Sequence, residues 1–243
     1  MNIYNIYNIK PVGEWIAGNP YVGRGILIGR SAHGGKAVFA YFIMGRSDNS
    51  RNRVFAKTDD GIRARPFDPG KMENPELILY TPVRRCGNSI VVSNGDQTDT
   101  IVEYLKKGSD METALETRSF EPDEPNFTPR ISGQLIFGDD GIFRYKMSVL
   151  KSMDDHGSAC TRHYFRYPAL PGLGHFIHTY ITDGEPLPSF TGEPERVFIP
   201  DSIDALTDDL WENMDSGNKI SLYVCSIDLK TCEEEYRLIN KNQ

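Results

Sequence analysis

The stretch KAVFAYFIMG, residues 36–45, is apolar at nearly every position between its first lysine and its final glycine. A strand with one solvated face alternates apolar and polar residues, whereas a strand covered on both faces does not. Just before it lies GILIGRS (25–31), and the Gly-rich link SAHGGK (31–36) has the length of a hairpin connection. The two runs therefore predict paired strands in a sheet that is sandwiched between other layers.

The rest of the chain alternates between further strand patterns and a few helical ones. Apolar runs predict strands at 76–80, 89–93, 132–150 (a hairpin), 219–229 and 233–240. Amphipathic spacing predicts helices at 98–107, 110–118 and 201–214. Residues 1–20 are expected to be an irregular extension, and residues 151–195 to hold short strands at best. This order predicts an α+β protein with stacked sheets and external helices.

Start and stop signals refine two of these helices. Thr98 or Asp99 can cap the first helix, and Gly108 ends it. Ser109 or Asp110 can cap the second.

Composition narrows the class of protein. The chain has 243 residues, of which 39% are hydrophobic, and its net charge is −7, so a wide basic surface for nucleic acid is not expected. No run approaches the roughly 18 apolar residues of a membrane helix, and the N-terminus lacks the features of a signal peptide. We therefore expect a cytosolic protein with no membrane partner. Its four cysteines form no CxxC pair, so reduced thiols are expected.

The segment VVSNGDQTDTI (91–101) places eight small or polar residues between a predicted strand and a predicted helix. One interpretation is a turn followed by an N-cap, with Gly95 supplying a positive φ. The other is a ligand-binding loop, because free backbone N–H groups at a helix N-terminus attract anions and polar ligand atoms. The number of polar groups exceeds what one cap needs, so both interpretations stay open.

A second polar concentration, GRSDNSRNRVF (45–55), contains Arg46, Arg51 and Arg53 directly after the apolar strand. Guanidinium groups bind phosphate or carboxylate oxygens bidentately, so this segment suits a small anion. A solvated charged loop is the alternative. Arg24 in YVGRG could join the same site in space.

Two other groups of residues invite a chemical interpretation. Cys160, His163, His175 and His178 have metal-ligand spacing, but the histidines lie in an alternating strand pattern that would point them to opposite faces. We therefore predict no metal site. The proline-rich loop FEPDEP (120–125) could hold a carboxylate as a general base if that carboxylate is partly buried, and otherwise leaves it exposed.

Four segments in this order, YVGRG, GRSDNSRNRVF, VVSNGDQTDTI and NFTPRI, resemble the archaeal-type inosine monophosphate (IMP) cyclohydrolase family over about residues 21–138. GLGHFIHTYITDGEPLPSF (172–190) looks like the C-terminal part of longer bacterial members. The resemblance implies a four-layer αββα sandwich similar to N-terminal nucleophile hydrolases, without their N-terminal nucleophile, since the chain begins Met1-Asn2. It also implies one domain over 1–243, with 1–20 as an extension and 140–243 as its less well-defined C-terminal part.

The activity that the resemblance implies is the last step of purine synthesis. 5-Formamidoimidazole-4-carboxamide ribonucleotide closes its second ring and loses water to give IMP, with no metal or organic cofactor. The family also suggests a homo-oligomer. A non-catalytic purine-nucleotide-binding protein and a related amide-bond hydrolase on the same scaffold stay open as alternatives.

Carried over residue by residue, the family's catalytic arginine, tyrosine and glutamate fall on Arg53, Tyr80 and Glu121. Insertions in the two loops leave Arg51 and Glu124 as rivals. The hypothesis makes Glu121 the general base, with Arg53 and Tyr80 stabilising or protonating the formyl oxygen. The remaining substrate-binding candidates are Arg24, Arg46, Arg51, Asn94, Asp96, Thr98, Asp99 and Arg130.

Overall fold

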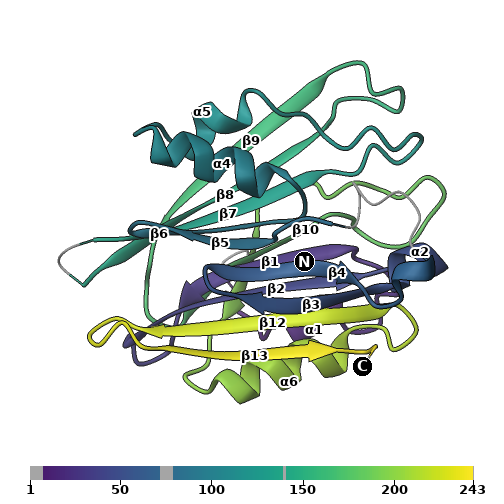
Figure 1. Ribbon diagram of the computed structural model, residues 1–243. Helices are drawn as coiled ribbons and strands as arrows, with labels where there is room; N and C mark the ends of the chain where they lie inside the picture. The colour runs from purple at the N-terminus through teal and green to yellow at the C-terminus, as the bar shows by residue number, and fades with distance from the viewer. Residues whose placement is uncertain (1–7, 72–78, 139–140, 243) are drawn as a thin grey trace, which may run out of the picture.

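The computed structural model describes residues 8–71, 79–138 and 141–242, which form an α+β fold built on two antiparallel sheets (Figure 1). The first sheet has the strand order β11-β10-β1-β2-β12-β13. Its strands are β1 (Arg24–Arg30), β2 (Lys36–Met44), β10 (Leu173–His178), β11 (Glu195–Phe198), β12 (Lys219–Asp228) and β13 (Glu234–Asn240). Strands from both ends of the chain therefore share this sheet.

The second sheet follows the chain order β3-β4-β5-β6-β7-β8-β9, each strand antiparallel to the next. Its strands are β3 (Arg53–Thr58), β4 (Gly61–Pro66), β5 (Val83–Cys86), β6 (Ser89–Ser93), β7 (Arg130–Phe137), β8 (Phe143–Ser152) and β9 (Cys160–Pro168). Because successive strands are neighbours, short loops join most of them.

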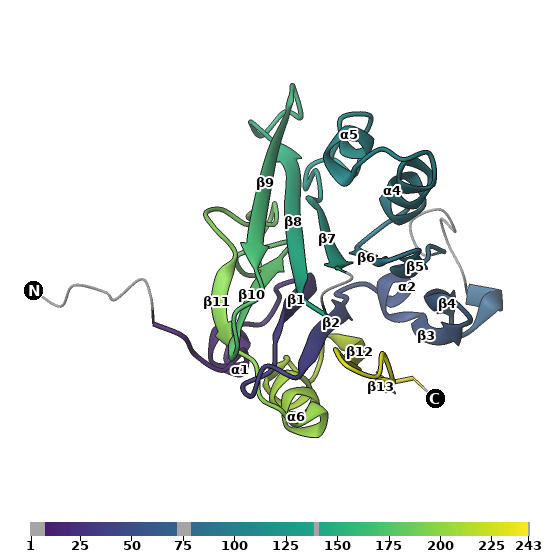
Figure 2. The ribbon, with the colours of Figure 1, turned by 90° about the vertical axis from the view of Figure 1, so that its left-hand side faces the viewer.

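The two sheets pack face to face, and helices cover their outer faces. Helices α1 (Gly13–Ile16) and α6 (Ile203–Asn213) pack against the first sheet, while α4 (Gln97–Lys106) and α5 (Met111–Leu115) pack against the second. Figure 2 shows the two pairs of helices on different sides of the molecule. The short helix α2 (Asp48–Arg51) connects β2 to β3, and a 3-10 turn, η1 (Pro69–Lys71), follows β4. The arrangement is compatible with the predicted sandwich.

Strand β2 explains why the sandwich forms. All of its residues from Ala37 to Met44 are buried, and they alternate between two separate cores. Phe39 and Tyr41 belong to the core between the sheets, whereas Phe42 belongs to the core under α1 and α6. Each such side chain gains roughly 1.5–3 kcal/mol from full burial, so the strand is stable only with both faces covered. The prediction of a doubly covered strand is confirmed.

Other predicted elements are confirmed with shifted boundaries. Helix α4 begins after Asp96, whose side chain makes no capping hydrogen bond, so the predicted cap at Thr98 or Asp99 was wrong. Gly108 ends this helix with φ +77°, as expected. Asp110 caps α5 by accepting a hydrogen bond from the backbone N–H of Thr113 (2.8 Å).

Three strands in the second sheet were not predicted. The hairpin β3–β4 turns at the acidic pair before Gly61, and the short β5 follows it. The nine-residue β9 contradicts the expectation of short strands in 151–195. It forms an edge of its sheet with every described side chain partly or fully exposed, so it lacks the apolar signal of a covered strand.

The remaining differences lie near residues that the structure does not describe. Of the strand predicted at 76–80, residues 76–78 lie outside the described residues, and Leu79 and Tyr80 belong to no strand. Residues 1–7 of the predicted extension also lie outside them. The described part of the extension is not irregular throughout, since it contains α1, and Val12 and Ile16 are buried in the core under α1 and α6.

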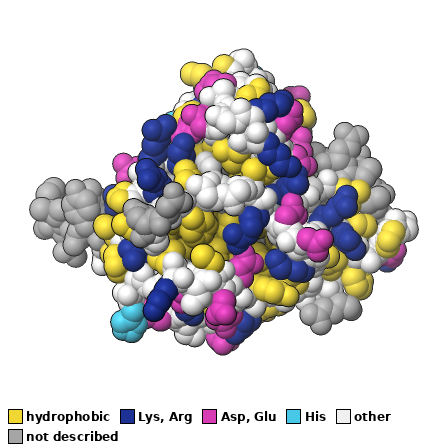
Figure 3. All heavy atoms as spheres, turned by 60° about the vertical axis from the view of Figure 1, so that its left-hand side comes forward, with side chains coloured by type: hydrophobic (Ala, Val, Ile, Leu, Met, Phe, Trp, Pro, Cys, Tyr) yellow, Lys and Arg dark blue, Asp and Glu magenta, His cyan; other side chains and the backbone are white. Residues whose placement is uncertain are grey.

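The molecular surface mixes charges of both signs on the face that Figure 3 shows, where lysine and arginine side chains stand beside acidic ones around apolar areas. None of the described helices has the length and apolar character needed to cross a membrane.

Candidate active site

Arg53 is the first residue of β3, and its side chain is only 1% exposed. Helix α2 precedes it, started by a capping box between Ser47 and Ser50. The Nε of Arg53 donates a hydrogen bond to the carbonyl oxygen of Ser50 (2.7 Å). Its Nη2 is buried and meets no acceptor among the described residues. A buried donor without an acceptor is costly, so this nitrogen is suited to an acceptor on a ligand.

Arg24 opens β1 and is partly buried in the same region, where it interacts electrostatically with Glu121 and Tyr80. Its backbone N–H donates to Oγ1 of Thr179 (3.1 Å), and its Nε is buried with no acceptor among the described residues. Burial lowers the pKa of Arg53, and the positive charge of Arg24 lowers it further. Both arginines stay protonated at neutral pH, because the guanidinium pKa is intrinsically above 12. Two like charges held this near each other favour an anionic or strongly polar ligand.

Tyr80 follows β4 in the chain and is 5% exposed. The backbone fixes its position, since its carbonyl oxygen accepts a hydrogen bond from the N–H of Ala64 (3.0 Å). Its hydroxyl lies 2.8 Å from the hydroxyl of Tyr41 on β2. Tyr80 interacts electrostatically with both Arg24 and Arg53, so the phenol belongs to the same group of side chains.

Glu121 lies in the proline-rich loop between α5 and β7, and a ring of local hydrogen bonds holds this loop. The N–H of Glu121 donates to the carbonyl oxygen of Thr128 (2.9 Å), and the N–H of Thr128 donates to Oδ1 of Asp123 (2.7 Å). The Thr128 hydroxyl also contacts Asp123 and Tyr180. These contacts turn Glu121 inward, where it is 7% exposed, while Glu124 stays exposed.

Burial raises the pKa of Glu121 above its ordinary value, although Arg24, Arg130 and Arg53 oppose that rise. A buried carboxylate with a raised pKa and nearby arginines suits a proton acceptor. Arg53, Tyr80, Glu121 and Arg24 thus come together from four separate segments of the chain.

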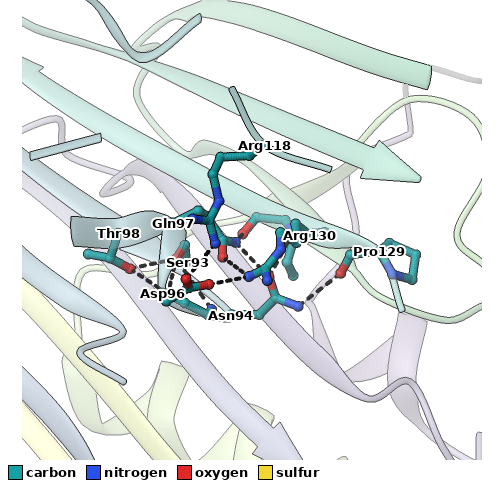
Figure 4. A network of polar contacts seen from close by, with 10 residues as sticks. Ser93, Asn94, Asp96, Gln97, Thr98, Arg118, Pro129 and Arg130 are labelled. Atoms are coloured by element: carbon teal, nitrogen blue, oxygen red, sulfur yellow. Dashed lines mark hydrogen bonds and ion pairs between the residues drawn. The ribbon is translucent and has the colours of Figure 1, made fainter. Parts of the chain in front are cut away.

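The polar loop after β6 forms a network of its own (Figure 4), and Gly95 of this loop lies near Glu121 of the cluster. Oδ1 of Asn94 accepts hydrogen bonds from Nε2 of Gln97 (2.9 Å) and from the N–H of Ile131 (2.9 Å), while Nδ2 of Asn94 donates to the carbonyl oxygen of Pro129 (2.9 Å). The hydroxyl of Thr98 bonds that of Ser93 (2.5 Å). These groups satisfy one another, which supports the interpretation of this segment as a structural turn.

Asp96 joins that network to two arginines. Its carboxylate contacts Nη2 of Arg118 (2.5 Å) and Nη1 of Arg130 (2.7 Å), and Arg130 also donates to Oε1 of Gln97 (2.7 Å). Partial burial alone would raise the pKa of Asp96, but the hydrogen bonds from these arginines hold it below its ordinary value. The network therefore fixes Arg130, whose charge acts on Glu121.

A glycine is required at position 95 because neighbouring side chains approach its backbone closely. It is not among the described residues with positive φ, so the predicted reason for this glycine was wrong. A Cβ atom at position 95 would lie 2.5 Å from Nη1 of Arg130, 2.7 Å from Oε1 of Gln97 and 3.6 Å from Oε1 of Glu121. The glycine thus lets the loop, Arg130 and Glu121 pack together.

Gly95→Ala is therefore expected to lower the free energy of unfolding by about 1–2 kcal/mol, because the new methyl group displaces Arg130 from its hydrogen bonds. Urea denaturation of the variant measures this. Gly35→Ala is the matched control, since a Cβ there meets no atom within 4 Å and its φ is not positive. Equal losses in the two variants would contradict the prediction.

The other predicted binding residues lie outside the buried cluster. Arg46 pairs with Asp183 (2.7 Å) and stacks over Tyr21, and Asp99 pairs with Arg84 (2.9 Å). Arg51 is exposed and donates to Gly45 and Asn218. Their polar groups are engaged with protein partners, so binding roles for them stay predictions.

The family model that matches this chain carries the description IMP cyclohydrolase-like protein and covers residues 21–231. That range includes every residue of the buried cluster. The chain belongs to the IMP cyclohydrolase-like family.

Named relatives support this membership. The chain is 30% identical over 116 residues to the IMP cyclohydrolase of Methanococcus aeolicus, covering 46% of this chain and 56% of the relative. It is 35% identical over 118 residues to that of Methanocaldococcus jannaschii (47% and 56%), and 29% identical over 142 residues to that of Haloquadratum walsbyi (56% and 67%). The match thus spans little more than half the length of the first of these relatives.

Within this IMP cyclohydrolase-like chain, the residues with metal-ligand spacing lie in different sheets. Cys160 and His163 belong to β9, whereas His175 and His178 belong to β10. His175 stacks on an aromatic ring of the second sheet and His178 stacks on Phe176, so the predicted alternation is confirmed. In the described ranges, no three His, Cys, Asp or Glu side chains group as metal ligands would.

Sequence reasoning identified Tyr80 but missed three further phenols around the buried cluster. Tyr41 lies inside the apolar strand that decided the fold, where nothing in the sequence distinguishes it from a core residue. Tyr21 and Tyr180, which stack on each other, also interact electrostatically with Arg24. The one signal available in the sequence was Tyr21, the first residue of the segment YVGRG.

Proposed function

We propose that this protein closes the ring of 5-formamidoimidazole-4-carboxamide ribonucleotide, releasing water and IMP in purine biosynthesis. The named relatives carry the name of this activity, and the chain belongs to their family. The observation that carries the proposal is the buried cluster itself. Two arginines, each with a nitrogen that meets no acceptor among the described residues, lie beside a phenol and a buried carboxylate with a raised pKa. A binding module has no need for a carboxylate in this state.

The chemistry needs few groups. The carboxamide nitrogen must attack the formyl carbon, and an amide nitrogen is a poor nucleophile unless a base removes its proton. The formyl oxygen gains negative charge and requires fixed donors. Both reacting groups are on one molecule, so the protein has to supply orientation, charge stabilisation and proton transfer.

We assign Glu121 as the base that takes one proton from the carboxamide nitrogen as the C–N bond forms. Tyr80 gives its proton to the formyl oxygen, and Arg53 stabilises the charge on that oxygen through its unpartnered Nη2. In the second step the protonated Glu121 donates to the hydroxyl that leaves as water. The proton of the former formamido nitrogen passes to the Tyr80 phenolate as the C=N bond forms. Protein groups then return to their starting state, and one water is lost.

The substrate's phosphate and ribose need further partners. Arg24 is the strongest candidate for an anionic group, since its Nε has no acceptor among the described residues. Arg130 supports Glu121, and a substrate contact would require it to exchange one of its present hydrogen bonds. We keep Asn94, Asp96, Thr98 and Asp99 as residues that shape the site, and Arg46 and Arg51 as outer candidates.

We also infer that the chain acts as the single domain expected over 1–243, with the fold of N-terminal nucleophile hydrolases. Strands of residues 24–44 pair with strands of residues 173–240, which supports a single domain. The layer order of helices, two sheets and helices supports the fold assignment. A homo-oligomer and a cytosolic location stay predictions.

Incubating the purified protein with the formylated ribonucleotide tests the proposal, because ring closure changes the ultraviolet spectrum. We expect formation of IMP, and the unformylated ribonucleotide serves as a control that cannot cyclise. Binding of the ribonucleotide without a spectral change would overturn the catalytic proposal and favour a nucleotide-binding protein.

A further inference from the structure

Tyr41 makes a contact that the proposed reaction does not yet use. It is fully buried on β2, its ring stacks on Phe55 (centroids 5.5 Å apart), and its hydroxyl lies 2.8 Å from the Tyr80 hydroxyl. Across the described residues, Tyr80 is the one partner recorded for the Tyr41 hydroxyl. Burying a hydroxyl costs free energy unless it is hydrogen-bonded, so this pairing is what makes a tyrosine tolerable at this position.

The direction of this hydrogen bond depends on what Tyr80 does with its own proton. Each phenol has one proton to donate. If the Tyr80 proton points to Tyr41, it is unavailable to a ligand. If Tyr41 donates instead, the Tyr80 proton is free to point elsewhere, and its oxygen receives a donor that stabilises negative charge. Hydrogen bonds to charged oxygens are roughly twice as strong as neutral ones, so this second arrangement strengthens as Tyr80 gives up its proton.

We infer that Tyr41 is a positioning residue that donates its hydroxyl proton to the oxygen of Tyr80, and so turns the Tyr80 proton toward the substrate. The inference rests on the proposed function, because it assigns Tyr41 a role in the proton donation by Tyr80. Arg24 and Arg53 both interact electrostatically with Tyr41, so Tyr41 lies within reach of the positive charges of the cluster. Tyr41 acts through Tyr80 and touches no reacting atom.

Tyr41→Phe is expected to lower kcat tenfold or more with little change in KM, since the ring and its stacking on Phe55 are kept. Tyr145→Phe is the matched control. Tyr145 is also a buried phenol, and among the described residues its hydroxyl has one side-chain partner, Nδ1 of His175 (2.6 Å). The causes of its raised pKa include none of the four cluster residues. Near-normal kcat in Tyr41→Phe, or an equal loss in Tyr145→Phe, would overturn the inference.

A double-mutant cycle separates action through Tyr80 from a general structural effect. If Tyr41 works through Tyr80, the change Tyr41→Phe has no further effect on kcat in a Tyr80→Phe background. If it lowers kcat there by the same factor as in the wild type, Tyr41 acts independently and the inference fails.

A readout without turnover keeps the inference testable if ring closure is not observed at all. With 3-fluorotyrosine incorporated at position 80, its fluorine resonance reports ionisation of that phenol. Removing the Tyr41 donor is expected to move this titration to higher pH, because the phenolate loses a hydrogen bond. An unmoved titration would refute the inference, whereas a shift without turnover would support the hydrogen bond from Tyr41 to Tyr80 and remove only its role in the proposed reaction.

Discussion

Arg53→Met is expected to lower kcat/KM for ring closure by about 100- to 1000-fold, the range seen when one donor to a developing oxyanion is removed. The guanidinium group is buried, held through Nε by Ser50, and keeps Nη2 free of acceptors among the described residues. A group fixed in this way loses no freedom when negative charge develops on the substrate. Steady-state kinetics on the formylated ribonucleotide measure the loss.

Arg51→Met is the matched control for this variant. Arg51 lies two residues away and was the rival assignment, but it is exposed and bonded to Gly45 and Asn218. Its loss should change kcat/KM less than threefold. A large effect at Arg51 together with a small one at Arg53 would reverse the assignment.

Misfolding is not expected to explain the Arg53→Met result. Burial lowers the pKa of Arg53, which means that the folded state disfavours its charge. Removing that charge should therefore leave the melting temperature unchanged or raise it. Arg53→Lys should also be impaired, since an ammonium group cannot keep one nitrogen on Ser50 while presenting another to the substrate.

The part of the fold that sequence predicts best is the part with an unambiguous period. Strand β2 is apolar throughout because both of its faces are covered, and that pattern alone required a layered structure. The prediction missed strand β9 for the opposite reason. It is an edge strand with exposed side chains, so no hydrophobic pattern marks it, and only pairing with β8 makes it a strand.

The residues of the candidate site, too, could be predicted from the sequence only in part. The sequence pointed to Arg53 and Glu121 as catalytic residues but could not exclude Arg51 and Glu124. Residues close together in one loop carry the same chemistry. Burial ranks them, and burial arises from contacts distant in sequence. Tyr41 could not be found at all, since its hydrogen bond to Tyr80 joins two segments 39 residues apart.

The loop at 93–99 illustrates how polar residues can mislead. Its many hydrogen-bonding groups suggested a ligand, yet they bind one another, Arg118 and Arg130. The loop contributes to the site indirectly, because it fixes the arginine whose charge reaches Glu121. A count of polar groups predicts a network, and only the structure says whether the network is closed.

Glu121→Gln is expected to lower kcat by about 100- to 10,000-fold, the contribution usual for a positioned general base. The amide keeps the size of the side chain and its place in the loop but cannot accept the carboxamide proton. Burial raises the pKa of Glu121, so kcat/KM of the wild type should rise with pH through a value above the ordinary glutamate pKa of about 4.3 and then level. In Glu121→Gln this dependence should vanish, and a pH–rate profile of both proteins tests it.

Glu124→Gln supplies the control, because Glu124 lies in the same loop and is exposed. It should keep both the rate and the pH profile of the wild type.

The stability of Glu121→Gln distinguishes the loss of a base from damage to the loop. A carboxyl whose pKa is raised by folding stabilises the protein below its unfolded pKa, and this contribution is lost as the pH rises through the folded pKa. At a pH above the folded pKa the ionised Glu121 therefore costs stability, and there Glu121→Gln should melt at or above the wild-type temperature. An inactive variant that melts well below the wild type would instead show that Glu121 holds the loop, and retained turnover would exclude it as the base.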